Sequence, residues 1–140
     1  MLVTENQKMR IASKSENIFL VEKMIEDVCE LFNISEDYYG NILVALTEAV
    51  NNAIHHGNKT NPNKNIDISF KALPTHISFV VKDEGDGFNY NALPDPTNPE
   101  NIEKPNGRGV FLMINLADKV TFEDNGSKVV LDFNIATSKI

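Results

Sequence analysis

Two polar residues stand four positions apart in the segment TEAVNNAIHHG, Glu48 and Asn52. On a helix, residues four apart project from one face, so these two side chains would share one wall of a pocket. A carboxylate in such a wall can polarise a water or a hydroxyl. A neutral amide oxygen is a hard ligand suited to Mg²⁺. Taken alone, the pair fits a solvated helix face equally well.

Two adjacent histidines, His55 and His56, follow in the same segment. Neighbouring residues on a helix diverge by about 100°, so the pair is poorly placed to share a metal ion. The HExxH spacing of zinc hydrolases is also absent. We expect one of the two, assigned to His56, to help close the floor of the pocket, and the other to lie on the surface.

A second motif, D-x-G-x-G, consists of Asp83, Gly85 and Gly87 and directly follows an apolar run. A carboxylate at the end of a strand can accept a hydrogen bond from an exocyclic amine such as that of adenine. The two glycines would let the backbone approach the ring closely. The alternative is an ordinary tight turn, for which DEGDG is suitable.

A third motif, G-x-G, comprises Gly107, Arg108 and Gly109 at the start of an apolar helix. Free amides and the dipole at a helix N-terminus favour phosphate, and Arg108 adds a fixed positive charge. The alternative is a flexible joint. The preceding stretch, 89–106, carries four prolines, and loops of such length are usually functional lids or disordered segments.

Two helices are expected ahead of the second motif. Apolar residues recur at helical intervals over about 14–32 and again over about 36–57. Ser13 begins a capping-box spacing before the first helix, and Ser35 is placed to cap the second. Gly57 is expected to end the second helix, because glycine adopts the left-handed conformation at low cost.

Strand-like patterns predict a largely antiparallel sheet. They mark five segments: 7–12, expected at an edge, 66–72, 76–82, 119–124 and 128–135. Asn125-Gly126 predicts a two-residue hairpin turn between the last two, because both central residues of that turn need positive φ. The order of elements predicts an α/β (α+β) two-layer sandwich with helices on one face, as one domain over 1–140.

Composition excludes several classes of protein. The formal net charge of -7 makes binding to nucleic acid through the overall field unfavourable. A single cysteine, Cys29, permits no intrachain disulfide and is expected to be a buried thiol. Neither a signal peptide nor a run of about 20 apolar residues is present, so the cytoplasm is the expected location.

The order of the three motifs resembles the GHKL ATPase superfamily, which includes DNA gyrase and the histidine kinases. The chain is most similar to the anti-sigma-factor serine kinases of bacterial partner switching. TEAVNNAIHHG resembles their N-box, VVKDEGDGF their G1 box and GRGVFLMINLAD their G2 region, while NGSKVVLDF is similar to their closing strand pair. The resemblance spans roughly residues 10–134 and implies a Bergerat-type ATP-binding fold.

The resemblance implies a role for each matched residue. Asn52 would ligate the Mg²⁺ bound to ATP, Glu48 would be the general base, and Asp83 would hydrogen-bond the adenine amino group. The segment 89–106 would be the ATP lid. The remaining cofactor contacts would come from His56, Gly85, Gly87, Gly107, Arg108, Gly109 and Ser127. The hydroxyl of Ser127 stands where the family usually has threonine.

The implied activity is phosphorylation of a serine on an anti-anti-sigma (STAS-type) protein, by a homodimer that also sequesters a sigma factor. Contact with nucleic acid or membrane is not expected. The alternative is a non-catalytic, nucleotide-gated binding module of the same fold. Retention of Glu48 favours the kinase, and the joint presence of three pocket motifs disfavours an adaptor that binds no nucleotide.

Overall fold

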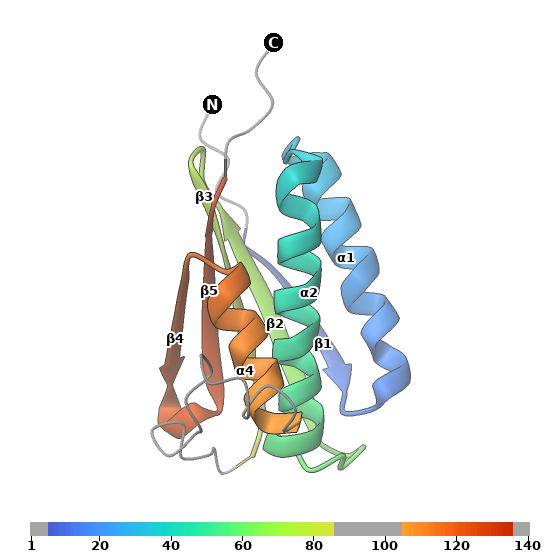
Figure 1. Cartoon of the computed structure of the whole chain (residues 1–140). Helices are drawn as coiled ribbons and strands as arrows, with labels where there is room; N and C mark the ends of the chain where they lie inside the picture. Colours follow the sequence, from blue (N-terminus) through green and yellow to red (C-terminus); the bar gives the residue numbers. More distant parts are fainter. Residues whose placement is uncertain (1–5, 86–104, 136–140) are drawn as a thin grey trace.

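The structure is a computed structural model that describes residues 6–85 and 105–135, without the side chains of 6–7, 105–108 and 125. The fold has two layers, as predicted: helices form one layer and cover one face of the sheet, which forms the other (Figure 1). The elements are β1 Asn6–Ala12, η1 Ser15–Asn17, α1 Ile18–Leu31, α2 Glu36–Asn52, η2 Ala53–Gly57, β2 Asn65–Ala72, β3 His76–Lys82, α4 Pro105–Leu116, β4 Lys119–Glu123, η4 Asp124–Gly126 and β5 Lys128–Asn134.

The described strands form one antiparallel sheet in the order β1-β2-β3-β5-β4. The edge position predicted for 7–12 is confirmed, since β1 pairs only with β2 within this sheet. Buried and less buried residues alternate along β2, β3 and β5, so one sheet face packs on the helices. β3 ends at Lys82, which places Asp83 just beyond the sheet.

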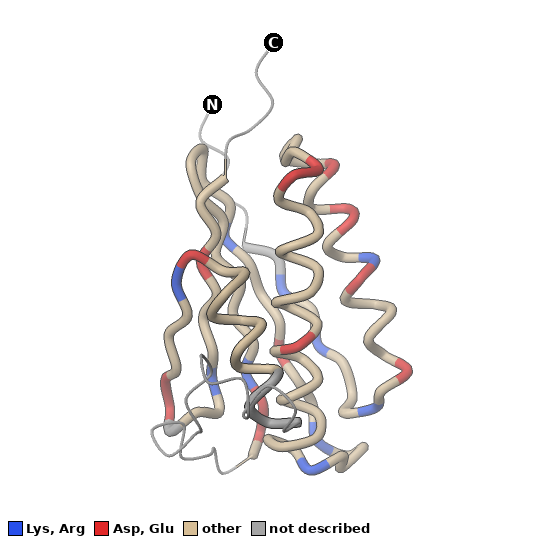
Figure 2. Tube along the Cα trace, in the orientation of Figure 1, with Lys and Arg blue, Asp and Glu red and all other residues tan. Residues whose placement is uncertain are grey.

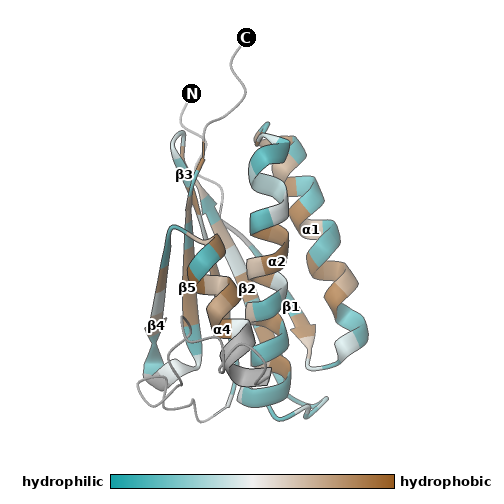
Figure 3. Ribbon diagram, in the orientation of Figure 1, coloured by the Kyte–Doolittle hydropathy of each residue, from teal (hydrophilic) through white to brown (hydrophobic). Residues whose placement is uncertain are grey.

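The core lies between the sheet and helices α1, α2 and α4, where the apolar faces meet (Figure 3). Phe70, Phe79 and Phe133 from three adjacent strands contact one another across its centre. The first pair is tilted and the second edge-to-face, with ring centroids 6.0 and 6.1 Å apart. Cys29 is buried as expected, and burial raises the pKa of its thiol to about 11. No helix within 6–85 or 105–135 has both the length and the apolar character needed to cross a bilayer.

The two predicted helix caps have different outcomes. The Ser35 side chain accepts a hydrogen bond from the Asp37 N–H at 3.2 Å, which confirms it as the cap of α2. The prediction for Ser13 is wrong, because its buried hydroxyl donates to the carbonyl of Lys64 at 2.9 Å instead. The first helix therefore begins with a 3₁₀ turn at Ser15 and becomes α-helical only at Ile18.

Two predictions about glycine conformation are also wrong. Gly57 closes the π-helical turn η2 without positive φ, which falls instead on Lys59 (53°) and Thr60 (59°). The connection between β4 and β5 contains the 3₁₀ turn Asp124–Gly126, so it is longer than the predicted two-residue turn. Positive φ occurs there at Asp124 (51°) and Gly126 (93°).

Candidate nucleotide site

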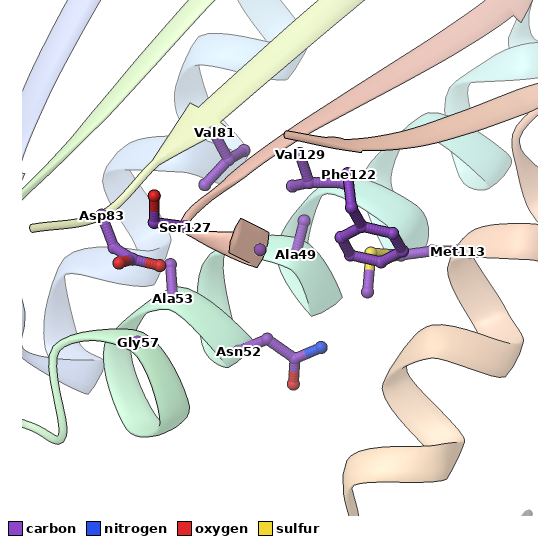
Figure 4. A pocket seen from close by; sticks show the side chains of 11 residues that line it. Ala49, Asn52, Ala53, Gly57, Val81, Asp83, Met113, Phe122, Ser127 and Val129 are labelled. Carbon is purple, nitrogen blue, oxygen red and sulfur yellow. The ribbon is translucent and has the colours of Figure 1, made fainter. Parts of the chain in front are cut away.

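Most of the predicted site residues that the structure describes lie at one end of the sheet, where β3 ends, β5 begins, α2 passes into η2 and α4 starts (Figure 1). A cavity of about 20 Å³ lies there. Its polar groups come from Asn52, Asp83 and Ser127, and its apolar wall from Ala49, Ala53, Val81, Met113, Phe122 and Val129 (Figure 4). This volume holds roughly one water, so a purine ring would need the wall to open.

Asp83 is the buried carboxylate at this end of the sheet. Its side chain is beside the last turn of the α2–η2 helix in Figure 4. Oδ1 accepts a hydrogen bond from the Gly85 N–H at 2.8 Å, and the Asp83 N–H donates to the Ser127 carbonyl at 2.9 Å. Burial raises the pKa of the Asp83 carboxyl, while the Gly85 N–H and the charge of Lys64 act in the opposite direction.

Gly57 and Gly85 allow two backbone segments to meet at Asp83. A Cβ on Gly57 would overlap the carboxylate of Asp83, and even the farther oxygen, Oδ1, would be only 2.9 Å away. A Cβ on Gly85 would collide with the carbonyl of Gly57, at 2.6 Å from its carbon. The conformation of Gly57 does not require glycine, but this close approach does.

Gly57→Ala is therefore expected to displace the Asp83 carboxylate and to weaken ATP binding on the order of tenfold. Gly40→Ala is the matched control, because Gly40 lies on α2, the helix that continues into η2, and a Cβ there meets nothing within 4 Å. That variant should bind ATP normally and be as stable as wild type or more so. Titration calorimetry measures both affinities, and equal binding by the two variants would contradict this role for Gly57.

Glu48 and Asn52 both lie against the first turns of α4. A Cβ built on Gly109 would be 3.1 and 3.2 Å from the amide nitrogen and oxygen of Asn52, and 3.3 Å from Oε2 of Glu48. Glu48 and Asn52 are half-buried, and Asn52 also lines the cavity. α4 begins at Pro105, two residues before the predicted start at Gly107, so the polar line of α2 meets α4 at Gly109 in its second turn.

The other predicted site residues are placed less directly. Ser127 lines the cavity, with its hydroxyl donating to the Asp124 carbonyl at 2.8 Å. His56 is exposed and does not line the cavity; its partial burial and its neighbour His55 lower its pKa. Gly107 lies in the first turn of α4. Outside the described residues lie Gly87, the 89–104 part of the predicted lid and the side chain of Arg108.

Charge is unevenly spread over the molecule. Acidic residues are spread along α1, whereas basic residues occur in the loop beyond the end of α2, next to the site (Figure 2). Lys59 and Lys64 lie in the loop between η2 and β2. The carboxylates of Asp83 and Glu84 lie at the same end, so the two lysines offset negative charge locally without making this end positive.

Sequence reasoning missed one buried polar residue at the site, Asn58, which is 1% exposed. It occurs in the polar loop NKTNPNKN, among other asparagines. Nothing in that composition separates a buried amide from solvated ones. The apolar residues Met113 and Phe122 were read only as parts of a helix and a strand, yet both line the cavity.

Comparison with known proteins gives consistent matches. The histidine kinase-like ATPase domain family matches residues 11–133. The proteins named serine-protein kinase RsbW from Staphylococcus aureus strains JH9 and Newman are each 32% identical over 127 residues, covering 85% of this chain and 80% of theirs. A crystal structure of the RsbU and RsbW domains of Rv1364c from Mycobacterium tuberculosis has a TM-score of 0.66 at 14% identity, covering 98% of this chain and 35% of that chain.

Proposed function

The chain belongs to the histidine kinase-like ATPase domain family, and we propose that it is a protein kinase that transfers the γ-phosphoryl group of Mg·ATP to a serine of a partner protein. The observation that carries the proposal is the junction at Gly109, where a helix N-terminal region meets a carboxylate and an amide. Helix N-terminal regions favour phosphate. The serine-protein kinase names of the similar Staphylococcus aureus proteins support the same reaction class.

The base of the nucleotide would bind at Asp83. Its carboxylate can accept a hydrogen bond from the 6-amino group of adenine, and Oδ1 is already oriented by the Gly85 N–H. The apolar wall between Val81 and Met113 would receive one face of the ring. Since methionine is flexible, Met113 is the lining side chain best suited to move aside. Gly85 and Gly87 would leave the backbone free to approach the ring.

The phosphates would lie between α2 and the start of α4. A Cβ at Gly109 would lie only 3.1 Å from the Asn52 amide and 3.3 Å from Glu48, so α4 packs closely on α2 here and would move aside to admit phosphates. The amide oxygen of Asn52 suits Mg²⁺, which would complete its shell with phosphate oxygens and water. When bound, the ion neutralises charge on the transferred group. The backbone amide of Gly107 in the first turn of α4, with Arg108, would contact the same phosphates, and Gly109 would lie alongside them.

Glu48 is proposed as the general base for the acceptor serine. It is half-buried, and its Oε2 lies on the same side of α2 as the Asn52 amide, facing Gly109. It does not line the cavity assigned to the base. Positioned in this way, the carboxylate can accept the hydroxyl proton without taking part in adenine recognition.

The proposed partners are an anti-anti-sigma (STAS-type) protein, which would carry the acceptor serine, and a sigma factor, which this chain would sequester. The chain would act as a homodimer in the cytoplasm, with residues 1–140 as one ATPase domain. The local lysines, rather than the net charge, would favour the anionic nucleotide. His56 and Ser127 would lie at the edge of the bound nucleotide.

The deciding experiment mixes the protein with [γ-³²P]ATP, Mg²⁺ and a candidate STAS-type partner. Label on one serine of the partner, lost when that serine is replaced by alanine, supports the kinase. ATP-dependent binding of the partner without label transfer would instead support a nucleotide-gated binding module. The absence of any measurable affinity for ATP in folded protein would contradict both.

A further inference from the structure

Asn58 is the first residue after the π-helical turn, and its amide side chain is buried beside the Asp83–Gly85 turn. Its N–H donates to the carbonyl of Ala53 at 2.8 Å, which closes the π turn. The position of Asn58 is thus fixed by the same turn that brings Gly57 against Asp83. π turns of this kind are frequent at functional sites.

The Asn58 side chain makes three hydrogen bonds. Nδ2 donates to the hydroxyl of Ser13 at 2.6 Å and to the carbonyl of Asn65 at 3.0 Å. Oδ1 accepts from the backbone N–H of Glu84 at 2.8 Å. The Glu84 side chain reinforces this bond, because its Oε1 accepts from the Asn65 N–H at 2.7 Å.

The bond to Glu84 acts on the turn that carries Asp83. The Glu84 N–H belongs to the peptide unit that joins Asp83 to Glu84, and the next N–H, that of Gly85, donates to the Asp83 carboxylate. The first of these amides is held by Asn58 and the second by the carboxylate itself, so two consecutive peptide units of the turn are anchored. Asn58 therefore anchors the peptide unit attached directly to the Cα of Asp83, the atom from which the carboxylate side chain projects.

We propose that Asn58 is a positioning residue that orients the Asp83 carboxylate and thereby makes the site select purines with a 6-amino group over those with a 6-oxo group. This inference rests on the proposed role of Asp83 in adenine recognition. ATP presents a donor to the carboxylate, whereas inosine triphosphate presents a carbonyl oxygen, which the carboxylate repels. Discrimination of this kind depends on the angle at which the carboxylate meets the ring.

Asparagine has the hydrogen-bonding groups that this position requires. Two donors and one acceptor are used within one short side chain. Aspartate would keep an acceptor for the Glu84 N–H but would lose both donors and bury a charge. Alanine would lose all three bonds. Aspartate should therefore preserve the orientation of the turn better than alanine, although it should stabilise the fold no better.

The test compares the affinities of ATP and inosine triphosphate, measured by calorimetry. Wild type should prefer ATP, and Asn58→Ala should reduce the ATP-to-inosine-triphosphate ratio about tenfold, mainly through weaker ATP binding. Asn58→Asp should retain more of the ratio than Asn58→Ala, even if it melts at a lower temperature. If Asn58 served the fold alone, the affinity ratio would fall in step with the melting temperature. Asn58→Asp would then not keep a higher ratio than Asn58→Ala while being no more stable.

Two controls separate positioning from loss of structure. Asn61→Ala removes a hydrogen bond within the same loop, from the Asn63 N–H to Oδ1 of Asn61, and does not involve Glu84. Ser13→Ala removes one partner of Asn58 but leaves the Asn58–Glu84 bond in place. Both should keep the wild-type ratio, although Ser13→Ala should lower the melting temperature.

Amide hydrogen exchange supplies a second readout that needs no nucleotide. The Glu84 amide should exchange faster in Asn58→Ala, while the amides of β3 remain protected. An unchanged affinity ratio in folded Asn58→Ala would overturn the inference, and so would an unchanged Glu84 exchange rate. A wild-type protein that binds ATP without preferring it would overturn both this inference and the role of Asp83. A wild type that binds no ATP would overturn the proposed function itself.

Discussion

The Glu48→Gln variant is expected to bind Mg·ATP like wild type and to phosphorylate the partner serine about 10²–10⁴-fold more slowly, the usual contribution of a general base. Glutamine keeps the shape of the side chain but cannot accept a proton at neutral pH. Binding should persist because Glu48 does not line the cavity assigned to adenine. Its position beside Gly109 places it at the phosphate end instead.

Calorimetry for affinity and single-turnover transfer of labelled phosphate separate the two effects of Glu48→Gln. Transfer in one turnover reports the chemical step without product release. Glu26→Gln, an exposed change on α1, controls for the loss of one negative charge. If Glu48→Gln transferred phosphate at the wild-type rate, Glu48 would not be the general base. A large loss of ATP affinity would show that its carboxylate serves binding.

The parts of the site that sequence predicted are those set by local geometry. The spacing of Glu48 and Asn52 needs only a helix, and the position of Asp83 needs only an alternating strand that ends at Lys82. Both follow from periodicities that are independent of the rest of the chain. The family resemblance supplied the pairing of α2 with the G-x-G turn at Gly109, which periodicity alone does not contain.

The parts that sequence could not predict are contacts between distant segments. Ser13 has the spacing of a helix cap, but bonds to Lys64 and Asn58 outweigh that local option. Gly57 suits a helix end, and its actual constraint is the carboxylate of Asp83, which lies far along the chain. In each case the residue type permits several roles, and packing selects among them.

One short segment joins the two halves of the proposed site. Asn52, at the phosphate end, is the last residue of α2. At the base end, Gly57 ends the π turn and Asn58 follows it. The π turn therefore sets the distance between the proposed ion ligand and the turn that carries Asp83. If the ion ligand and the anchor of the Asp83 turn were on separate elements, the distance between them would depend on how those elements pack in the core.

Asp83→Asn is expected to weaken ATP binding about 10–150-fold, since hydrogen bonds to charged groups contribute about 1.5–3 kcal/mol. The amide introduced by this substitution could still accept from the Gly85 N–H, but it would lack the charge that attracts the amino group of adenine. Inosine triphosphate should lose less affinity, because an amide can donate to its carbonyl oxygen. Asp27→Asn, an exposed change on α1, should leave both affinities unchanged.

The same variant should be at least as stable as wild type when no nucleotide is present. Burial raises the pKa of Asp83 above its ordinary value of 3.8, so the fold favours the protonated form. The resulting stabilisation is fully present below pH 3.8 and is lost as the pH rises through the folded pKa. Above the folded pKa wild type therefore holds an ionised, buried carboxylate at a cost that Asp83→Asn avoids.

Thermal melts across pH test this reasoning directly. Without nucleotide, the melting temperature of Asp83→Asn relative to wild type should rise as the pH increases from acid to neutral. With saturating Mg·ATP at pH 7 the order should reverse, because only wild type gains the full stabilisation by ligand. A variant that is less stable than wild type without nucleotide, and equally stabilised by ATP, would mean that Asp83 supports the fold rather than reading the base. The buried charge of Asp83 thus lowers stability without nucleotide, and the same charge gives the site its selectivity for the amino group of adenine.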